Sequence, residues 1–203
     1  MSKEIEYKVK QKMLKVQEVA EAGYAAEQRF TYEDYCTWPD DERWELIDGI
    51  PFKMDAPSRY HQKISVNVLI KIANFLVNKT CEVYHAPFDV RLNVGEGKDT
   101  VVQPDIVVIC DRNHLDHKGA KGAPEFVIEI LSPSTVHHDR VRKLEKYQQY
   151  GVKEYWIVDP ISKTVAVYLF EITDLTIYEM GAEIEAAILP GFSISLKDIF
   201  ADE

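Results

Sequence analysis

Two acidic residues beside strongly apolar segments have the types and spacing to bind one divalent metal ion. Glu129 lies in the middle of residues 126–134, FVIEILSPS, whose apolar character predicts a strand buried on both faces. Asp105 follows Pro104 and directly precedes a second apolar run in VVQPDIVVI, residues 101–109. A buried carboxylate is costly unless it is paired or bound to a metal. Two carboxylates on neighbouring strands can converge on one hard cation such as Mg²⁺, with water and a substrate phosphate as further ligands.

Each acidic residue, taken alone, also has a simpler interpretation. Glu129 is compatible with an exposed strand edge or with a salt bridge to an arginine, and Asp105 with an aspartate that ends a turn. Glu45 in WELID, residues 44–48, fits the solvent-facing side of an alternating strand as well as it fits a further metal or water ligand. The ordered pattern of Pro-Asp, strand, loop and second apolar strand with Glu favours the metal site.

The elements that must position these residues are predicted from apolar periodicity and turn residues. Asp48-Gly49 turns a hairpin over residues 43–54, Thr31 caps a short helix, and Ser58 begins a long helix with Ile64, Val68, Ile72 and Phe75 on its buried face. A second helix over residues 138–150 ends at Gly151. Strands are predicted at 81–86, 88–93, 101–110, 125–131, 154–159, 164–170, 176–180 and 184–189, with a loop at 111–124. This order predicts an α/β (α+β) fold, a mixed β-sheet flanked by helices.

The first 29 residues are predicted to form a helical extension, and residues 30–203 the domain itself. A helix over residues 3–22 carries one apolar stripe, made of Ile5, Val9, Met13, Val16 and Ala20. We expect the stripe to pack on the domain or on a partner chain.

Composition and charge limit the class of protein. No apolar run approaches the ~20 residues that span a bilayer, and the N-terminus has no apolar segment of the kind that a secretory signal contains. The three cysteines are far apart and odd in number, which fits neither a disulfide framework nor a metal knuckle, so a reduced cytoplasmic protein is expected. The net charge of -10 is unusual for a nucleic-acid protein, but a local basic stripe beside a metal site can suffice.

Pro104-Asp105 followed by Glu129 resembles the PD-(D/E)XK nuclease superfamily. More closely, the chain resembles the Uma family of bacterial restriction endonucleases over about residues 30–200, through WELIDG, QPDIVVI, FVIEILSPST, RKLEKYQQYGVKEYWIVDP and LPGFSISLKDIF. The resemblance implies a restriction-endonuclease-like fold and a Mg²⁺-dependent DNA endonuclease, with Mn²⁺ as a substitute. It further implies that Asp105 and Glu129 bind the metal, that a lysine assists the water, and that the products are a 5′-phosphate and a 3′-hydroxyl.

The position of that lysine departs from the superfamily pattern, because Leu131 stands two residues after Glu129, where lysine is expected. Similar proteins supply the lysine from the next helix, where Lys143 fits and Lys146 is the rival. Lys143 would lie at the edge of the buried face if that face is formed by Val141, Leu144 and Tyr147. His61, three residues before Ile64, is expected to be a histidine at the edge of the core.

The leading hypothesis is therefore a Mg²⁺-dependent DNA endonuclease in which Asp105 and Glu129 bind metal, Lys143 orients or polarises the water, and Glu45 is an accessory carboxylate. Basic residues near the site are expected to hold the DNA backbone, namely Lys118, Lys121, Arg140, Arg142 and Lys146. A homodimer or larger homo-oligomer is expected, because a two-strand cut needs two active sites and cyclic two-fold assembly is the commonest. The alternative is an inactive nuclease fold that serves as a homo-oligomeric binding or scaffold module, which the acidic charge and Leu131 favour.

Overall fold

The computed structural model describes residues 3–23, 27–39, 41–95, 97–132 and 138–201, and the side chains of these residues except at 3–9 and 138–140. The chain divides into two compact units. The first unit comprises Met1–Asp55 and Arg91–Val102, and the second comprises Ala56–Val90 and Gln103–Glu203. The boundary between an extension and a domain after residue 29 stays a prediction.

The first unit contains a small antiparallel sheet. Strands β1 (Trp44–Ile47) and β2 (Ile50–Lys53) form the predicted hairpin. The Asp-Gly turn is confirmed, because Asp48 and Gly49 both adopt left-handed backbone angles, with φ of 52° and 74°. On its other side β1 pairs with β5 (Thr100–Val102), and β4 (Val90–Asn93) follows in the strand order.

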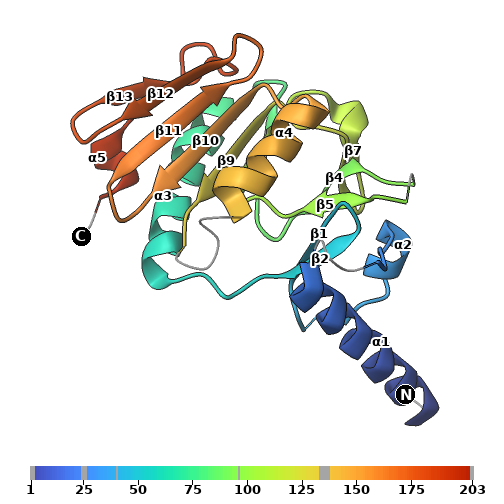
Figure 1. Cartoon of the computed structure of the whole chain (residues 1–203). Helices are drawn as coiled ribbons and strands as arrows, with labels where there is room; N and C mark the ends of the chain where they lie inside the picture. Colours follow the sequence, from blue (N-terminus) through green and yellow to red (C-terminus); the bar gives the residue numbers. More distant parts are fainter. Residues whose placement is uncertain (1–2, 24–26, 40, 96, 133–137, 202–203) are drawn as a thin grey trace. The chain divides into compact units, whose positions relative to one another are not determined.

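Two helices complete the first unit: α1 (Lys3–Ala22) and α2 (Tyr32–Tyr35) (Figure 1). Thr31 and Asp34 cap α2 reciprocally, as predicted for Thr31. Part of the α1 stripe is buried against the unit's own core, which contains Val16, Val19, Phe30, Trp38, Trp44, Leu46 and Val101. The stripe therefore needs no partner chain at these positions, and the homo-oligomer stays a prediction. Within the described residues, no helix combines the length and apolar character required to cross a membrane.

The second unit is built on a six-stranded mixed sheet in the order β12-β11-β10-β9-β6-β3. Only β9 and β10 pair in parallel, and their neighbours pair antiparallel. The mixed sheet confirms the predicted fold class. The six strands are β3 (Glu82–His85), β6 (Ile106–Ile109), β9 (Phe126–Ile130), β10 (Glu154–Asp159), β11 (Thr164–Leu169) and β12 (Asp174–Tyr178).

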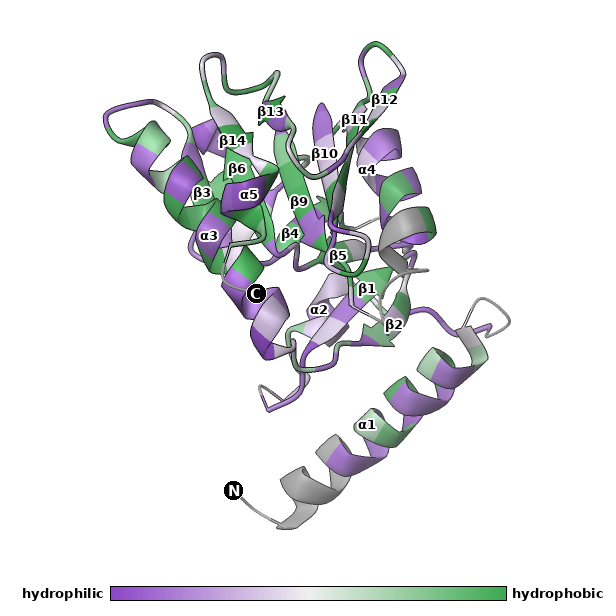
Figure 2. Cartoon of the chain, turned by 90° about the vertical axis from the view of Figure 1, so that its left-hand side faces the viewer, coloured by the Kyte–Doolittle hydropathy of each residue, from purple (hydrophilic) through white to green (hydrophobic). Residues whose placement is uncertain are grey.

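Helices α3 (Arg59–Leu76) and α4 (Leu144–Tyr150) cover opposite faces of this sheet (Figures 1 and 2). Ser58 caps α3 as predicted, by accepting a hydrogen bond from the backbone N–H of His61. The inner face of α3 packs on alternate residues of β6, β9 and β10, and the hairpin of β13 (Glu183–Glu185) and β14 (Ser193–Ser195) with α5 (Leu196–Ile199) extends this core. The buried residues include Ile64, Val68, Ile72, Ile106, Val108, Ile128, Ile130, Trp156, Ile184, Ile194 and Ile199.

Two predicted elements are wrong. The strand expected over residues 101–110 is two strands, β5 and β6, in different sheets, because Pro104 has no N–H to continue a ladder. The loop expected at 111–124 contains a short helix, η2 (Arg112–His114), and a hairpin of β7 (Leu115–Asp116) and β8 (Gly119–Lys121). Glycine is required at position 119, where φ is 123° and an added Cβ would lie 2.3 Å from the carbonyl oxygen of Asp89.

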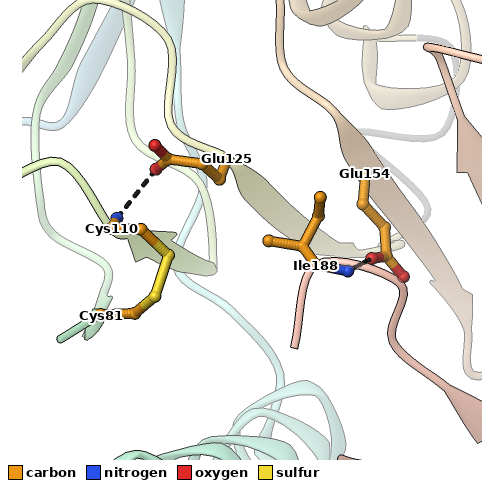
Figure 3. The surroundings of a disulfide bond; sticks show 5 residues. All are labelled: Cys81, Cys110, Glu125, Glu154 and Ile188. Carbon is orange, nitrogen blue, oxygen red and sulfur yellow. Dashed lines mark hydrogen bonds between the residues drawn. A yellow bond between two sulfur atoms is a disulfide. The ribbon is translucent and has the colours of Figure 1, made fainter. Parts of the chain in front are cut away.

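The prediction that the cysteines form no disulfide is also wrong. Cys81 and Cys110 form a disulfide between the ends of β3 and β6 (Figure 3). Cys36 is exposed and free. The two strands pair antiparallel with Glu82 opposite Ile109, so the same register brings the two cysteines together. Sequence spacing did not reveal this pairing because the two cysteines are 29 positions apart and the chain between them includes a segment of the first unit. The predicted cytoplasmic location stays a prediction.

Glu154 is a fully buried carboxylate at the start of β10. It accepts hydrogen bonds from the indole N–H of Trp156 at 2.7 Å and from the backbone N–H of Ile188 at 2.9 Å, as Figure 3 shows for Ile188. Burial raises the pKa of Glu154 above its ordinary value of 4.5, and the N–H donors only partly oppose this. The residue thus ties the segment before β14 to the sheet.

We expect Glu154→Gln to lower the free energy of unfolding at pH 4 by about 1–3 kcal/mol, because the new amide N–H₂ would face an N–H donor. The pKa of Glu154 is raised in the folded protein. Its contribution to the free energy of unfolding of the wild type is therefore fully present below the pKa that Glu154 has in the unfolded chain, and it is lost as the pH rises through the pKa in the folded protein. The difference in free energy of unfolding between wild type and variant should therefore become smaller from pH 4 to pH 8, as measured by urea unfolding followed by circular dichroism. A gap that widens with pH would contradict the predicted direction of the shift.

Candidate active site

The register of β6 and β9 brings Asp105 and Glu129 together. Ile106 is paired with Ile128 in this antiparallel ladder, so the next position places Asp105 opposite Glu129. The backbone N–H of Asp105 lies 3.4 Å from Oε2 of Glu129, and the backbone N–H of Ile130 donates to Oδ2 of Asp105 at 2.8 Å. The prediction that the two strands are adjacent is confirmed.

Glu129 is held on the α4 face of the sheet by two side chains. The Lys143 ammonium donates to Oε1 at 2.9 Å, and the Tyr147 hydroxyl donates to the same oxygen at 2.7 Å. The Lys143 and Glu129 side chains are each only 3% exposed, so the ion pair is removed from solvent. Lys143 ends a π-helical turn, η3 (His138–Lys143), and Tyr147 follows four residues later, which places both side chains on one face of the helix.

The structure distinguishes the two candidate lysines by their contacts. Lys143 binds Glu129, whereas the ammonium of Lys146 donates to Gln149 within α4. Leu131, where the superfamily pattern expects lysine, is buried. The expectation that Val141 faces the sheet is wrong, because its side chain is 41% exposed. The wider π-helical turn changes which residues face inward before α4 begins.

Besides the backbone N–H of Ile130, the carboxylate of Asp105 has a side-chain partner that the sequence did not predict. Nε2 of His61 lies 3.1 Å from Oδ2 of Asp105. His61 is buried, as its expected place at the core edge implies, but it lies in the first turn of α3, where the helix meets the beginning of β6. Its position three residues before Ile64 indicated burial, and no motif in the sequence linked it to Asp105.

The oxygen atoms of these carboxylates suit a hard divalent cation. Among the residues that the structure describes, no three or more His, Cys, Asp and Glu side chains gather as a metal-ligand set. Mg²⁺ does not need such a set, because it is commonly bound by one or two carboxylates together with waters and substrate phosphates. The Asp105 side chain is 19% exposed, so solvent can reach it. Asp105 and Glu129 therefore fit Mg²⁺ or Mn²⁺ by their chemistry.

The chain matches a known family of proteins. Residues 32–197 match the model of the Uma2 family, described as "Putative restriction endonuclease". The chain belongs to this family. The chain is 27% identical over 153 residues to an uncharacterized protein of Synechocystis sp., a match that covers 74% of this chain and 79% of that protein.

A solved structure supports the fold of this Uma2 family member. The crystal structure of a protein from Anabaena variabilis, titled "a putative nuclease belonging to DUF820", superposes with a TM-score of 0.71 at 21% identity. The superposition covers 84% of this chain and 97% of the Anabaena protein. The restriction-endonuclease-like fold predicted from the sequence is thereby confirmed.

The other predicted site residues of this Uma2 family member are Glu45 and the basic residues expected to bind DNA. Glu45 lies in β1 of the first unit and is 1% exposed, so the interpretation as a solvent-facing strand residue is wrong, and its role as an accessory carboxylate stays a prediction. Lys118 and Lys121 are exposed at the β7–β8 hairpin, and Arg142 and Lys146 are half-buried on η3 and α4. The side chain of Arg140 lies outside the described residues.

Proposed function

We propose that this protein is a Mg²⁺-dependent endonuclease that hydrolyses phosphodiester bonds of DNA. The observation that carries the proposal is the cluster of Asp105, Glu129 and Lys143 where the start of β6 meets the end of β9, in a chain of the Uma2 family. The backbone N–H of Asp105 approaches one oxygen of Glu129 and the Lys143 ammonium binds the other. Two carboxylates on paired positions of adjacent strands, one of them bound to a lysine, form a residue set that suits metal-assisted hydrolysis.

In this proposal Asp105 and Glu129 hold the cation. When bound, Mg²⁺ lowers the pKa of a coordinated water and stabilises negative charge on the phosphate. The chain's own contribution is to fix both carboxylates through the β6–β9 register and through donors on each of them. Fixed ligands lose little conformational freedom when the cation and substrate bind.

Lys143 has two roles in the proposed reaction. Its ammonium binds Glu129 at 2.9 Å, so its positive charge lies beside the proposed metal ligand, where it would orient the attacking water or contact the phosphate. Its positive charge also balances one of the two carboxylates in the absence of metal. Basic side chains at the β7–β8 hairpin and on α4, including Lys118, Lys121 and Lys146, would contact the DNA backbone despite the net charge of -10.

A second candidate function is an inactive nuclease fold that serves as a homo-oligomeric binding or scaffold module. The observation that favours it is the ion pair of Glu129 with Lys143, because the charge of this carboxylate is already balanced inside the protein. The acidic net charge points in the same direction, since it weakens binding to DNA.

Nicking of supercoiled plasmid at low salt separates the two functions. We expect the wild-type protein to nick DNA with Mg²⁺ or Mn²⁺ and to be inactive with EDTA, because the proposed water activation depends on the cation. Binding of Mn²⁺ without DNA, measured by calorimetry, provides a second readout. The absence of both cleavage and Mn²⁺ binding would leave the scaffold function standing.

A further inference from the structure

His61 and the backbone of β9 hold the same oxygen of Asp105. Nε2 of His61 lies 3.1 Å from Oδ2, and the N–H of Ile130 donates to Oδ2 at 2.8 Å. An ionised carboxylate only accepts hydrogen bonds, and each of its oxygens offers about two lone-pair sites. The two N–H donors therefore occupy Oδ2, which leaves Oδ1 as the oxygen of Asp105 that can bind a cation.

We propose that His61 is a positioning residue of the active site, which donates from Nε2 to Oδ2 of Asp105 and directs Oδ1 to the cation. This inference rests on the proposed function, because it assumes that Asp105 is a metal ligand. His61 acts through Asp105 and needs no contact with the substrate.

The surroundings of His61 make it suitable for this role. Its side chain is 9% exposed, and its ring leaves from the first turn of α3, directly after the Ser58 cap. Further along α3, Ile64 and Val68 are fully buried in the core of the second unit. The position of His61 is thus fixed by a packed helix, so the hydrogen bond orders Asp105 before any cation arrives.

Three variants test the proposal by their affinity for Mn²⁺, measured by titration calorimetry on the full chain. His61→Leu keeps an apolar side chain in the site but removes the donor, and we expect the affinity to fall about 10–100-fold, as for other losses of a hydrogen bond to a metal ligand. His61→Gln should retain most of the wild-type affinity, because its amide N–H₂ can donate to the same oxygen. Gln62→Leu, at the exposed neighbouring position of α3, is the control and should bind as the wild type does.

Plasmid cleavage at increasing Mn²⁺ concentration distinguishes a loss of metal affinity from a structural defect, because added metal would not restore a misfolded site. The His61→Leu protein should regain cleavage as Mn²⁺ is raised to saturation, because the variant loses metal affinity while Asp105, Glu129 and Lys143 remain. Circular dichroism and unfolding without metal establish that each variant is folded.

The outcomes separate this inference from the proposed function. If the wild type binds Mn²⁺ and His61→Leu binds it equally well, His61 has no positioning role, although the proposed function stands. The positioning role is also overturned if His61→Gln is as weak as His61→Leu. If the wild type itself binds no Mn²⁺, the proposed function fails and the positioning role fails with it.

Discussion

Asp105→Asn should reduce metal-dependent cleavage by roughly 10³-fold or more, because a bound metal contributes several kcal/mol to the reaction and each 1.36 kcal/mol is a factor of ten. The variant loses one of the two carboxylates that are proposed to bind the cation. Its fold should be unaffected, since the amide oxygen of asparagine can still accept from Ile130 and His61. Plasmid nicking and thermal unfolding with and without Mg²⁺ measure the two effects.

Thermal unfolding gives this prediction a control that does not depend on activity. A ligand that binds only the native state raises the melting temperature, so Mg²⁺ should stabilise the wild type and leave Asp105→Asn unchanged. Without metal the variant should be as stable as the wild type or more so, because two nearby carboxylates repel each other. Equal nicking by wild type and variant would identify the cleavage as a contaminant.

Glu129 is a less suitable position for the same test. Glu129→Gln removes the partner of a buried ammonium, and breaking a buried ion pair by removing one charge typically costs about 3–5 kcal/mol. Loss of activity in that variant would therefore combine loss of the metal ligand with loss of stability. The carboxylate of Asp105 accepts from the N–H groups of Ile130 and His61, which an asparagine oxygen can replace, so Asp105 avoids this difficulty.

Lys143→Met should lower the cleavage rate by about 10²-fold or more, the usual effect of losing one charge-stabilising or proton-transfer group. Metal binding should survive, because both carboxylates remain. Metal-free stability should fall by about 3–5 kcal/mol, because Glu129 would be left as an uncompensated buried charge. Added Mg²⁺ should restore part of that stability, since the cation supplies the missing positive charge.

The matched control for this prediction is Lys146→Met, three residues further along α4. Its ammonium donates to Gln149 and not to Glu129, so its loss should weaken DNA binding through the proposed backbone contact but should change the cleavage rate at saturating DNA and the melting temperature far less. A single-turnover nicking assay at saturating Mg²⁺ compares the two variants. Similar losses in both would show that position 143 has no special role, and full activity of Lys143→Met would exclude the proposed part of its ammonium.

Local signals in the sequence predicted most elements of the second unit. Ser58 at a helix start and Gly151 at a helix end have strong backbone preferences, and both are where they were expected. The adjacency of β6 and β9 followed from two apolar runs separated by one connection. The contact of Lys143 with Glu129 agrees with the prediction that the lysine comes from the following helix.

Contacts that depend on tertiary structure could not be predicted in the same way. His61 and Asp105 are 44 positions apart in sequence numbering (105 minus 61), and only the packing of α3 at the start of β6 brings them into contact. The Cys81–Cys110 disulfide likewise depends on the β3–β6 register. The condition that Val141 shares the buried face with Tyr147 is not met, because a π-helical turn does not follow the periodicity of an α-helix.

The division of the first unit between two stretches of chain has a consequence for its biosynthesis. Its core includes Val101, and one side of β1 pairs with β5. Both Val101 and β5 follow all of α3 and β3 in the sequence. A ribosome adds about 5–20 residues per second, so Trp44 and Leu46 emerge seconds before the strand that covers them. During that interval Val16 and Val19 of α1 can already pack against the part of this core that has been synthesised. The first unit therefore cannot finish folding until residue 102 has left the ribosome.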